Sequence, residues 1–317
     1  MSPTIPSGRP AGSLAFRRRN DDAPMIAGLL RTGRPKQWLK NVLVFAAPGA
    51  AGVLDEGPSL GRAALAFVAF CLAASGTYFW NDVLDVEADR SHPTKRNRPI
   101  AAGVVSIGTA RVTGVLLLAG SLAVASLTGR WETVAIVGMY IAVTISYSVV
   151  LKRIAVVDLV VIASGFVLRA AAGAVAVNVP MSDWFVLCTT FGSLFIVTGK
   201  RYAELIHLTG LGADAGASRA TLTEYTAGFL RVVLAVSCAA TLVSYCQWAF
   251  ETRDLSTSDW PLYELSIVPM LTALLRYGLV LEQGHGAAPE DVFASDRVLQ
   301  VMGVAWLVVY GLAVYTR

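Results

Sequence analysis

The chain has 317 residues, of which 55% are hydrophobic and only 15% are charged, and its net charge is +4. Soluble domains carry about 25% charged residues, so this composition excludes an ordinary soluble enzyme. A net charge this small on so long a chain also gives no indication of a nucleic-acid partner.

The first 33 residues differ in composition from the rest of the chain. They are rich in Pro, Ser, Gly and Arg, and no apolar segment follows the arginines at 17–19 closely, as it would in a cleaved signal peptide. We expect residues 1–33 to form a mostly disordered cytoplasmic tail. Residues 34–317 are then expected to form one membrane domain.

Nine apolar segments follow, most of them close to the about 20 residues that a helix needs to span a bilayer. They cover residues 39–54, 61–81, 107–128, 131–150, 156–178, 183–201, 227–250, 262–281 and 298–316. The first segment is short and contains Pro48, Gly49 and Gly52, so we expect it to be bent. The pattern predicts an all-α polytopic membrane protein with nine transmembrane helices.

The positions of the basic residues predict the orientation of these helices. With the N-terminus in the cytoplasm, most of the 26 lysine and arginine residues fall on the inner side. Four fall outside, at Arg62, Arg130, Arg253 and Arg317, while Arg169 lies within an apolar segment. The positive-inside rule therefore predicts an N-in/C-out protein of the plasma membrane. Since the polar connections then face the cytoplasm, we expect the active site on that side.

The most informative stretch is residues 81–103, NDVLDVEADRSHPTKRNRPIAAG, which follows the second apolar segment. On a helix, Asn81, Asp82, Asp85 and Asp89 would share one broad face. Three carboxylates and an amide on one face would repel one another unless a hard cation lay between them. Mg²⁺ suits such oxygen ligands and bridges them to substrate phosphates. The spacing therefore predicts that these four residues bind Mg²⁺.

A basic half follows the acidic half of this stretch. Pro93 disfavours a helical conformation at His92, so we expect the helix to end there. Lys95, Arg96 and Arg98 follow on a loop, where they could bind phosphate oxygens that the metal leaves free. A solvated loop between two membrane helices is the commoner interpretation of an acidic motif alone, but the cations that follow favour a phosphate site.

Other polar residues lie at the inner ends of further segments. Lys36, Lys40 and Asn41 open the first segment, where basic residues often serve only as interfacial anchors. Lys152 and Arg153 are best interpreted as charges that set topology. A charge within the membrane costs a few kcal/mol and usually faces a partner or a cavity, which draws attention to Asp158 and Arg169.

The stretch at 81–103 resembles the first aspartate motif of the UbiA superfamily of intramembrane prenyltransferases, NDxxDxxxD followed by an RPI-type segment. The resemblance extends from Arg34 to the end of the chain. It implies a nine-helix UbiA-type bundle in which Mg²⁺ holds a diphosphate. Family members carry a second acidic motif, whereas this chain has Lys200, Arg201, Tyr202 and Glu204 at that place. A second acidic metal cluster is therefore not expected.

Further matches resemble one branch of the superfamily, which transfers 5-phosphoribose from phosphoribosyl diphosphate to decaprenyl (polyprenyl) phosphate. They lie at residues 34–41, 92–103, 191–195, 199–205 and 296–300. This resemblance implies a Mg²⁺-dependent phosphoribosyltransferase whose lipid product serves the synthesis of cell-wall arabinan, including arabinogalactan.

The resemblance also suggests roles for individual residues. The predicted catalytic residues are Asp82, Asp85, Asp89, Lys95, Arg98 and Lys200. The predicted substrate-binding residues are Lys36, Lys40, Asn41, Tyr147, Arg153, Arg169, Arg201, Tyr202 and Glu204. Among these, the basic side chains are expected to bind the phosphates of the sugar and of the lipid, and Tyr202 and Glu204 to orient ribose hydroxyls.

Two alternatives stay open at this point. A UbiA-type enzyme could instead transfer a prenyl group from prenyl diphosphate to an aromatic acceptor, but that reaction predicts two acidic motifs. A secondary transporter could use Asp158 and Arg169 in an ion path, which predicts polar residues near the bilayer midplane in several helices. Membrane lipid is an expected partner in every case, and a homo-oligomer is compatible with each.

Overall fold

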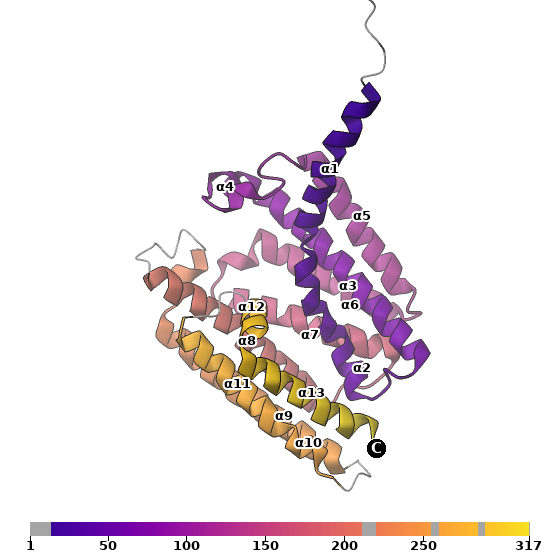
Figure 1. The fold of residues 1–317 in the computed structure, drawn as a ribbon, viewed down its shortest axis with the longest axis vertical. Coiled ribbons are helices and arrows are strands. Elements are labelled where there is room, and N and C mark those ends of the chain that lie inside the picture. Colours follow the sequence, from indigo (N-terminus) through magenta and orange to yellow (C-terminus); the bar gives the residue numbers. More distant parts are fainter. Residues whose placement is uncertain (1–13, 211–219, 255–259, 285–288, 317) are drawn as a thin grey trace, which may run out of the picture.

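The computed structural model describes residues 14–210, 220–254, 260–284 and 289–316. Over these residues it is all helical and has no strand, as predicted (Figure 1). Seven helical segments are long and apolar enough to cross a membrane. They are α3 (Gly57–Leu84), α5 (Ile107–Ser126), α6 (Trp131–Val149), α7 (Val157–Val177), α9 (Ala227–Asp254), α10 (Leu262–Leu265) together with α11 (Ile267–Glu282), and α13 (Arg297–Tyr315).

The other two predicted spans have a different character, so the described residues give seven candidate spans where nine were expected. The first apolar segment is a 3₁₀ helix, η1 (Pro35–Phe45), followed by the short α2 (Ala46–Ala50). The segment is therefore irregular, as its change from 3₁₀ to α-helix at Ala46 shows. Helix α8 (Asp183–Gly210) has 28 residues, but Lys200 and Arg201 interrupt its apolar run.

The N-terminal segment also differs from the prediction. Residues 1–13 of the expected tail lie outside the described residues, whereas α1 (Leu14–Gly33) is a helix. Its last turns are packed: Thr32 is 1% exposed, and a Cβ on Gly28 would lie 2.9 Å from Cγ2 of Val105. Leu29 also packs against a small core with Phe79 and Ile100, although Ile26 and Leu30 are exposed, so the packed part of the chain begins within α1.

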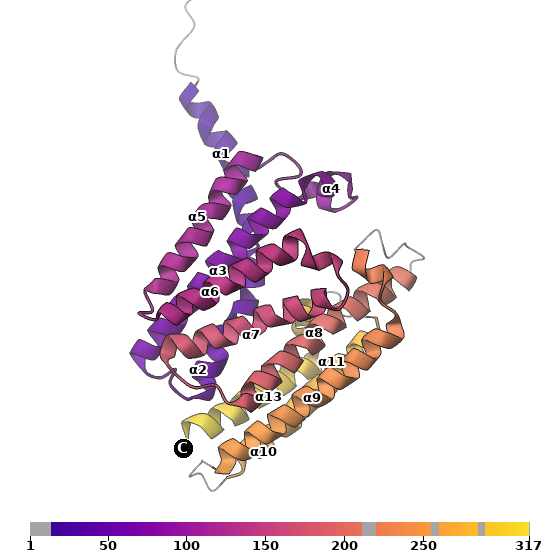
Figure 2. The same cartoon turned by 180° about the vertical axis from the view of Figure 1, so that it is seen from behind.

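Helix α7 joins the two halves of the bundle. In Figures 1 and 2, α3, α5 and α6 lie on one side of α7, while α8, α9, α11 and α13 lie on the other. The first turns of α7 contribute Leu159 and Ala163 to a core with Phe195 of α8. Its last turns contribute Ala172 and Ala176 to a second core that also contains η1 and α3 residues. A shift of α7 would therefore affect both halves.

Small residues allow η1 to lie directly on α7. Gly173 faces the backbone of η1 so closely that an added Cβ would lie 1.7 Å from the carbonyl oxygen of Val44. Ala172 and Ala176 on either side are fully buried. Small side chains commonly permit such close backbone approach between membrane helices. The irregular η1 is thereby held against the regular α7.

Candidate active site

The acidic motif, meaning Asp82, Asp85 and Asp89, lies where α3 passes into the short α4 (Val86–Ser91), at the end of the bundle opposite α10 and the C-terminus (Figures 1 and 2). Asp85 separates the two helices, yet its N–H bonds the carbonyl of Asn81 at 3.0 Å. The N–H of Asp89 likewise bonds the carbonyl of Asp85 at 2.8 Å. The helical register predicted from the spacing therefore continues through the junction.

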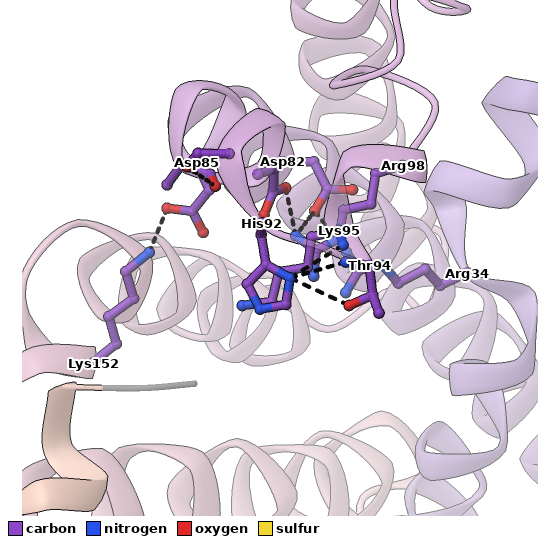
Figure 3. Close-up of polar contacts among 11 residues, drawn as sticks. Arg34, Asp82, Asp85, His92, Thr94, Lys95, Arg98 and Lys152 are labelled. Carbon is purple, nitrogen blue, oxygen red and sulfur yellow. Dashed lines mark hydrogen bonds and ion pairs between the residues drawn. The ribbon is translucent and has the colours of Figure 1, made fainter. Parts of the chain in front are cut away.

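Two arginines neutralise the buried members of this motif. Asp82 is 2% exposed and Asp89 is 3% exposed. Arg98 Nη1 lies 2.7 Å from Asp89 Oδ2 and 3.3 Å from Asp82 Oδ1, while Arg34 Nη2 lies 2.6 Å from the same Asp82 oxygen (Figure 3). Burial makes these contacts necessary, because an isolated buried carboxylate is strongly disfavoured. Arg98 was a predicted site residue, but Arg34 was not.

A third cation reaches the motif from a distant part of the chain. Lys152, in the 3₁₀ turn η3 (Leu151–Arg153), places its Nζ 2.7 Å from Asp85 Oδ1 (Figure 3). The sequence alone suggested only a topological role for this lysine. Its neighbour Arg153, which was predicted to bind substrate, is exposed.

The basic loop after α4 is fixed by local contacts. His92 Nδ1 accepts the N–H groups of Thr94 and Lys95 at 3.2 and 3.3 Å (Figure 3). Ile100, which is 1% exposed, anchors the following residues in a small core with Phe79. These contacts hold the loop that carries Lys95 and Arg98 beside the acidic motif.

A second polar cluster lies at the start of α7. Arg201 of α8 is 1% exposed, and it donates to Asp158 Oδ2 at 3.2 Å and to Glu204 Oε2 at 3.1 Å. The Tyr225 hydroxyl donates to Asp158 Oδ1 at 2.5 Å and accepts the Val156 N–H at 2.6 Å. Burial, followed by the hydrogen bond to Asp158, raises the pKa of Tyr225, so its hydroxyl stays protonated at neutral pH.

Tyr202 is next to Arg201 in sequence but does not bond the Asp158 cluster. Its hydroxyl donates to Glu282 Oε2 at 2.9 Å and accepts from Arg231 Nε at 2.9 Å. These bonds link α8 with α11 and α9. The structure therefore places Tyr202 between helices and does not bring it to the acidic motif, while Lys200 is half-buried on α8.

Arg169 lies in the interior of the bundle. Its guanidinium donates to Asn41 Oδ1 at 2.7 Å, to the Gly165 carbonyl at 2.6 Å and to the Tyr140 hydroxyl at 3.0 Å. Its Cζ also lies 5.4 Å from the ring centroid of Phe166. These contacts explain how a charge is tolerated there and tie η1 to α6 and α7, so neither Arg169 nor Asn41 reaches the acidic motif.

The remaining predicted residues lie on η1 and α6. Lys36 is exposed on η1, and Lys40 Nζ bonds Gln37 Oε1 at 2.5 Å. Tyr147 is half-buried near the end of α6. Sequence reasoning had no local signal for Arg34, Lys152 or Tyr225 as site residues, because their partners lie 48 to 69 positions away.

The predicted four-residue Mg²⁺ cluster is not assembled in this conformation. Among the described residues, no group of three or more His, Cys, Asp or Glu side chains is arranged to hold a metal. Asp85 instead bonds Lys152. However, Asp82 and Asp89 converge on one nitrogen of Arg98, so two buried carboxylates already face the same point. Their donor chemistry fits a divalent cation.

A large apolar cavity lies between the two halves of the bundle. Its volume is about 720 Å³, and η1, α2, α7, α8, α9, α11, α12 (Pro289–Ser295) and α13 contribute to its walls. The lining is almost entirely apolar and includes Phe45, Phe166, Phe195, Trp248 and Trp306. Such a cavity suits a hydrocarbon chain and offers little to a polar ligand.

The chain is similar in sequence to several proteins that carry the same name. The chain is 43% identical over 302 residues to the decaprenyl-phosphate phosphoribosyltransferase of Corynebacterium glutamicum, covering 94% of this chain and 90% of that protein. It is 45% identical over 300 residues to the enzyme of the same name from Mycobacterium tuberculosis, covering 92% of this chain and 96% of that one.

Solved structures share the fold at much lower sequence identity. A UbiA homolog from Archaeoglobus fulgidus, bound to GPP and Mg²⁺, superposes with a TM-score of 0.68 at 18% identity. The match covers 92% of this chain and all of that one. In addition, residues 42–295 match the model of the UbiA prenyltransferase family. With this match over most of its length, and with its acidic motif at the end of α3, the chain belongs to the UbiA prenyltransferase family.

Proposed function

We propose that this protein transfers 5-phosphoribose from phosphoribosyl diphosphate to decaprenyl phosphate, giving decaprenylphosphoryl-5-phosphoribose and diphosphate. The observation that carries the proposal is the identity of 43–45%, over more than nine tenths of the chain, to enzymes named for this reaction. Lys200 and Arg201, at the place of a second acidic motif, also favour a donor rich in phosphate.

The charges at the acidic motif support a site that exchanges its ion pairs on binding substrate. The three carboxylates are paired with three cations, which we call the counter-cations: Arg34, Arg98 and Lys152. Phosphate oxygens form strong charge-assisted hydrogen bonds with such groups. The counter-cations are therefore placed to turn from the carboxylates to an incoming diphosphate.

The carboxylates released in this exchange are the expected metal ligands. Asp82 and Asp89 would hold the ion with Asn81, joined by Asp85 once Lys152 has turned away. A bound Mg²⁺ would supply neutralisation of the charge that builds on the leaving diphosphate.

The reaction itself makes modest demands on the protein. The bond between the ribose anomeric carbon and the diphosphate breaks, and an oxygen of the lipid phosphate forms the new bond to that carbon. Because the lipid phosphate is already ionised, no general base is needed, and catalysis depends on positioning and electrostatic stabilisation. Lys95, Lys200 and Arg201 are the remaining basic residues proposed to bind the phosphates.

The apolar cavity is the proposed site for the prenyl tail. It lies between the halves of the bundle, and its walls carry the aromatic side chains expected to contact a hydrocarbon chain. The phosphate end of the same lipid would then lie toward the acidic motif, where the counter-cations hold the donor diphosphate.

The proposed topology has the N-terminus and the active site in the cytoplasm, the C-terminus outside, and η1–α2 and α8 as the two further membrane segments. The inner-side excess of basic residues supports this orientation in the plasma membrane. The product would serve as a donor for cell-wall arabinan. A transporter is not favoured, because Asp158 is paired with Arg201 at the start of α7. Arg169 likewise already bonds neutral acceptors and lies against aromatic rings.

The experiment uses purified protein with labelled phosphoribosyl diphosphate and decaprenyl phosphate, with and without a chelator, followed by lipid extraction. We expect a labelled lipid only when the divalent cation is present. Asp85→Ala should abolish the product. Glu87→Ala should not, because the Glu87 side chain is 79% exposed and forms an ion pair with Arg90, which is also exposed. Wild-type turnover by Asp85→Ala would defeat the role of the motif. A product from prenyl diphosphate and an aromatic acceptor, with none from phosphoribosyl diphosphate, would defeat the proposed donor.

A further inference from the structure

The turn between α6 and α7 contains a strained residue. Val156 has φ 68° and ψ −47°, a region that L-residues rarely adopt and that is especially unfavourable for a β-branched side chain. Such a conformation persists only where surrounding contacts hold it. Val156 must therefore be held by contacts around the turn.

Ala155 packs against the core that contains Leu159, but the other apolar side chains around Val156 contribute less. Val150, Ile154 and Val156 are 52%, 45% and 48% exposed. The Val156 carbonyl accepts the N–H groups of Leu159 and Val160, both at 3.1 Å, which fixes the turn to the start of α7. Its own N–H is held by the Tyr225 hydroxyl at 2.6 Å.

Tyr225 is itself rigidly placed. It is 6% exposed, and its hydroxyl donates to Asp158, which is fully buried and also bonded by Arg201. The strained turn is thus clamped from the second half of the bundle. Four residues before Val156, Lys152 reaches Asp85 in the first half at 2.7 Å.

The geometry points to Tyr225 as a positioning residue, which holds the strained turn so that Lys152 stays at the acidic motif. If Val156 relaxed to a negative φ, the chain before it would change direction and Lys152 would leave Asp85. The inference rests on the proposed function in assuming that Lys152 serves the donor diphosphate. Tyr225 would thereby couple the two halves of the bundle at the site.

The test starts from Tyr225→Phe, which removes only the hydroxyl. We expect kcat/KM for phosphoribosyl diphosphate to fall about tenfold, the effect of one hydrogen bond that maintains an unfavourable conformation. The matched control is Tyr263→Phe, since Tyr263 is 1% exposed in α10 at the far end of the bundle, and it should leave kcat/KM unchanged. Equal losses in both variants would overturn the inference.

Rescue distinguishes positioning from simple packing. Glycine adopts positive φ without strain, so Val156→Gly should restore the activity of Tyr225→Phe to within about threefold of wild type. In a Lys152→Met background, Tyr225→Phe should cause no further loss. Failure of the rescue, or an undiminished loss in that background, would overturn the inference. If Tyr225→Phe alone aggregates, the double variant with Val156→Gly decides: a folded, active protein supports the clamp, and an unfolded one contradicts it.

Hydrogen exchange separates this inference from the proposed function. Exchange at residues 150–158 should increase in Tyr225→Phe and stay unchanged in Tyr263→Phe, whatever reaction the protein catalyses. Unchanged exchange at 150–158 would contradict the clamp, whereas faster exchange in a protein without phosphoribosyl transfer would leave the clamp supported and defeat only the proposed function.

Discussion

Gly173→Ala is the substitution for which the structure predicts the largest effect from the smallest chemical change. The added Cβ would lie 1.7 Å from the Val44 carbonyl oxygen and 2.7 Å from its carbonyl carbon. Ordinary contacts begin near 3.4 Å, so η1 or α7 would have to retreat by about 1.7 Å. The obstacle is backbone, and Asn41 on η1 is tied to Arg169 on α7 itself, so neither element can simply swing aside. We expect a destabilisation of about 3 kcal/mol, at the upper end of overpacking costs.

The measurement is thermal unfolding in detergent, together with the rate of phosphoribosyl transfer. Transfer should also fall, because η1 supplies Val42 and Phe45 to the wall of the apolar cavity. The control is Gly138→Ala on α6, where an added Cβ meets no atom within 4 Å. There, the better helix propensity of alanine should leave stability unchanged or raise it by up to about 1 kcal/mol. Indistinguishable melting curves for the two variants would refute the close crossing of η1 and α7.

Two further predictions concern charges. Lys152→Met should reduce the initial rate with labelled phosphoribosyl diphosphate about a hundredfold, which is the usual effect of removing one preorganised hydrogen-bond donor. Lys152→Arg should retain more activity, because it keeps the positive charge beside Asp85. Asp296 caps α13 and lies 2.7 Å from Arg276, whose hydrogen bond lowers the pKa of this carboxyl. Its ionised form therefore stabilises the fold at neutral pH, and this contribution is lost as the pH falls through the lowered pKa. Asp296→Asn should lower the Tm at pH 7, and its difference in Tm from wild type should shrink below about pH 4. A difference in Tm that persists at lower pH would contradict the assignment.

The sequence predicted the features that depend on local physics. A bilayer requires long apolar helices, so hydropathy located α3, α5, α6 and α7 closely. The spacing of the aspartates predicted a helical face, and the register does continue from Asn81 to Asp89. The irregular η1 was harder to predict, because its packing involves Gly173, a residue of α7 far from η1 in sequence.

Contacts between residues far apart in the chain could not be predicted from local sequence patterns. Lys152 and Asp85 are 67 positions apart, and nothing near Lys152 distinguishes it from a charge that sets topology. Arg169 is a related case, since the charge within a membrane helix suggested a partner but could not identify it. Its cost is met by Asn41, Tyr140 and a backbone carbonyl, an arrangement that only the packed helices can supply.

Metal removal tests whether the counter-cations balance the acidic motif without a metal. A chelator should abolish phosphoribosyl transfer, because the reaction needs the metal. It should shift the Tm by less than about 2 °C, which corresponds to under about 1 kcal/mol, because the three carboxylates are already paired with cations. Arg98→Ala supplies the contrast, since it leaves Asp89 buried at 3% exposure without the guanidinium that it bonds at 2.7 Å. In that variant the metal becomes the main neutralising charge, so the chelator should lower the Tm clearly. A wild-type Tm that falls as far as that of Arg98→Ala would mean that the ion pairs do not replace the metal, and the proposed exchange between carboxylates, counter-cations and diphosphate would have to be abandoned.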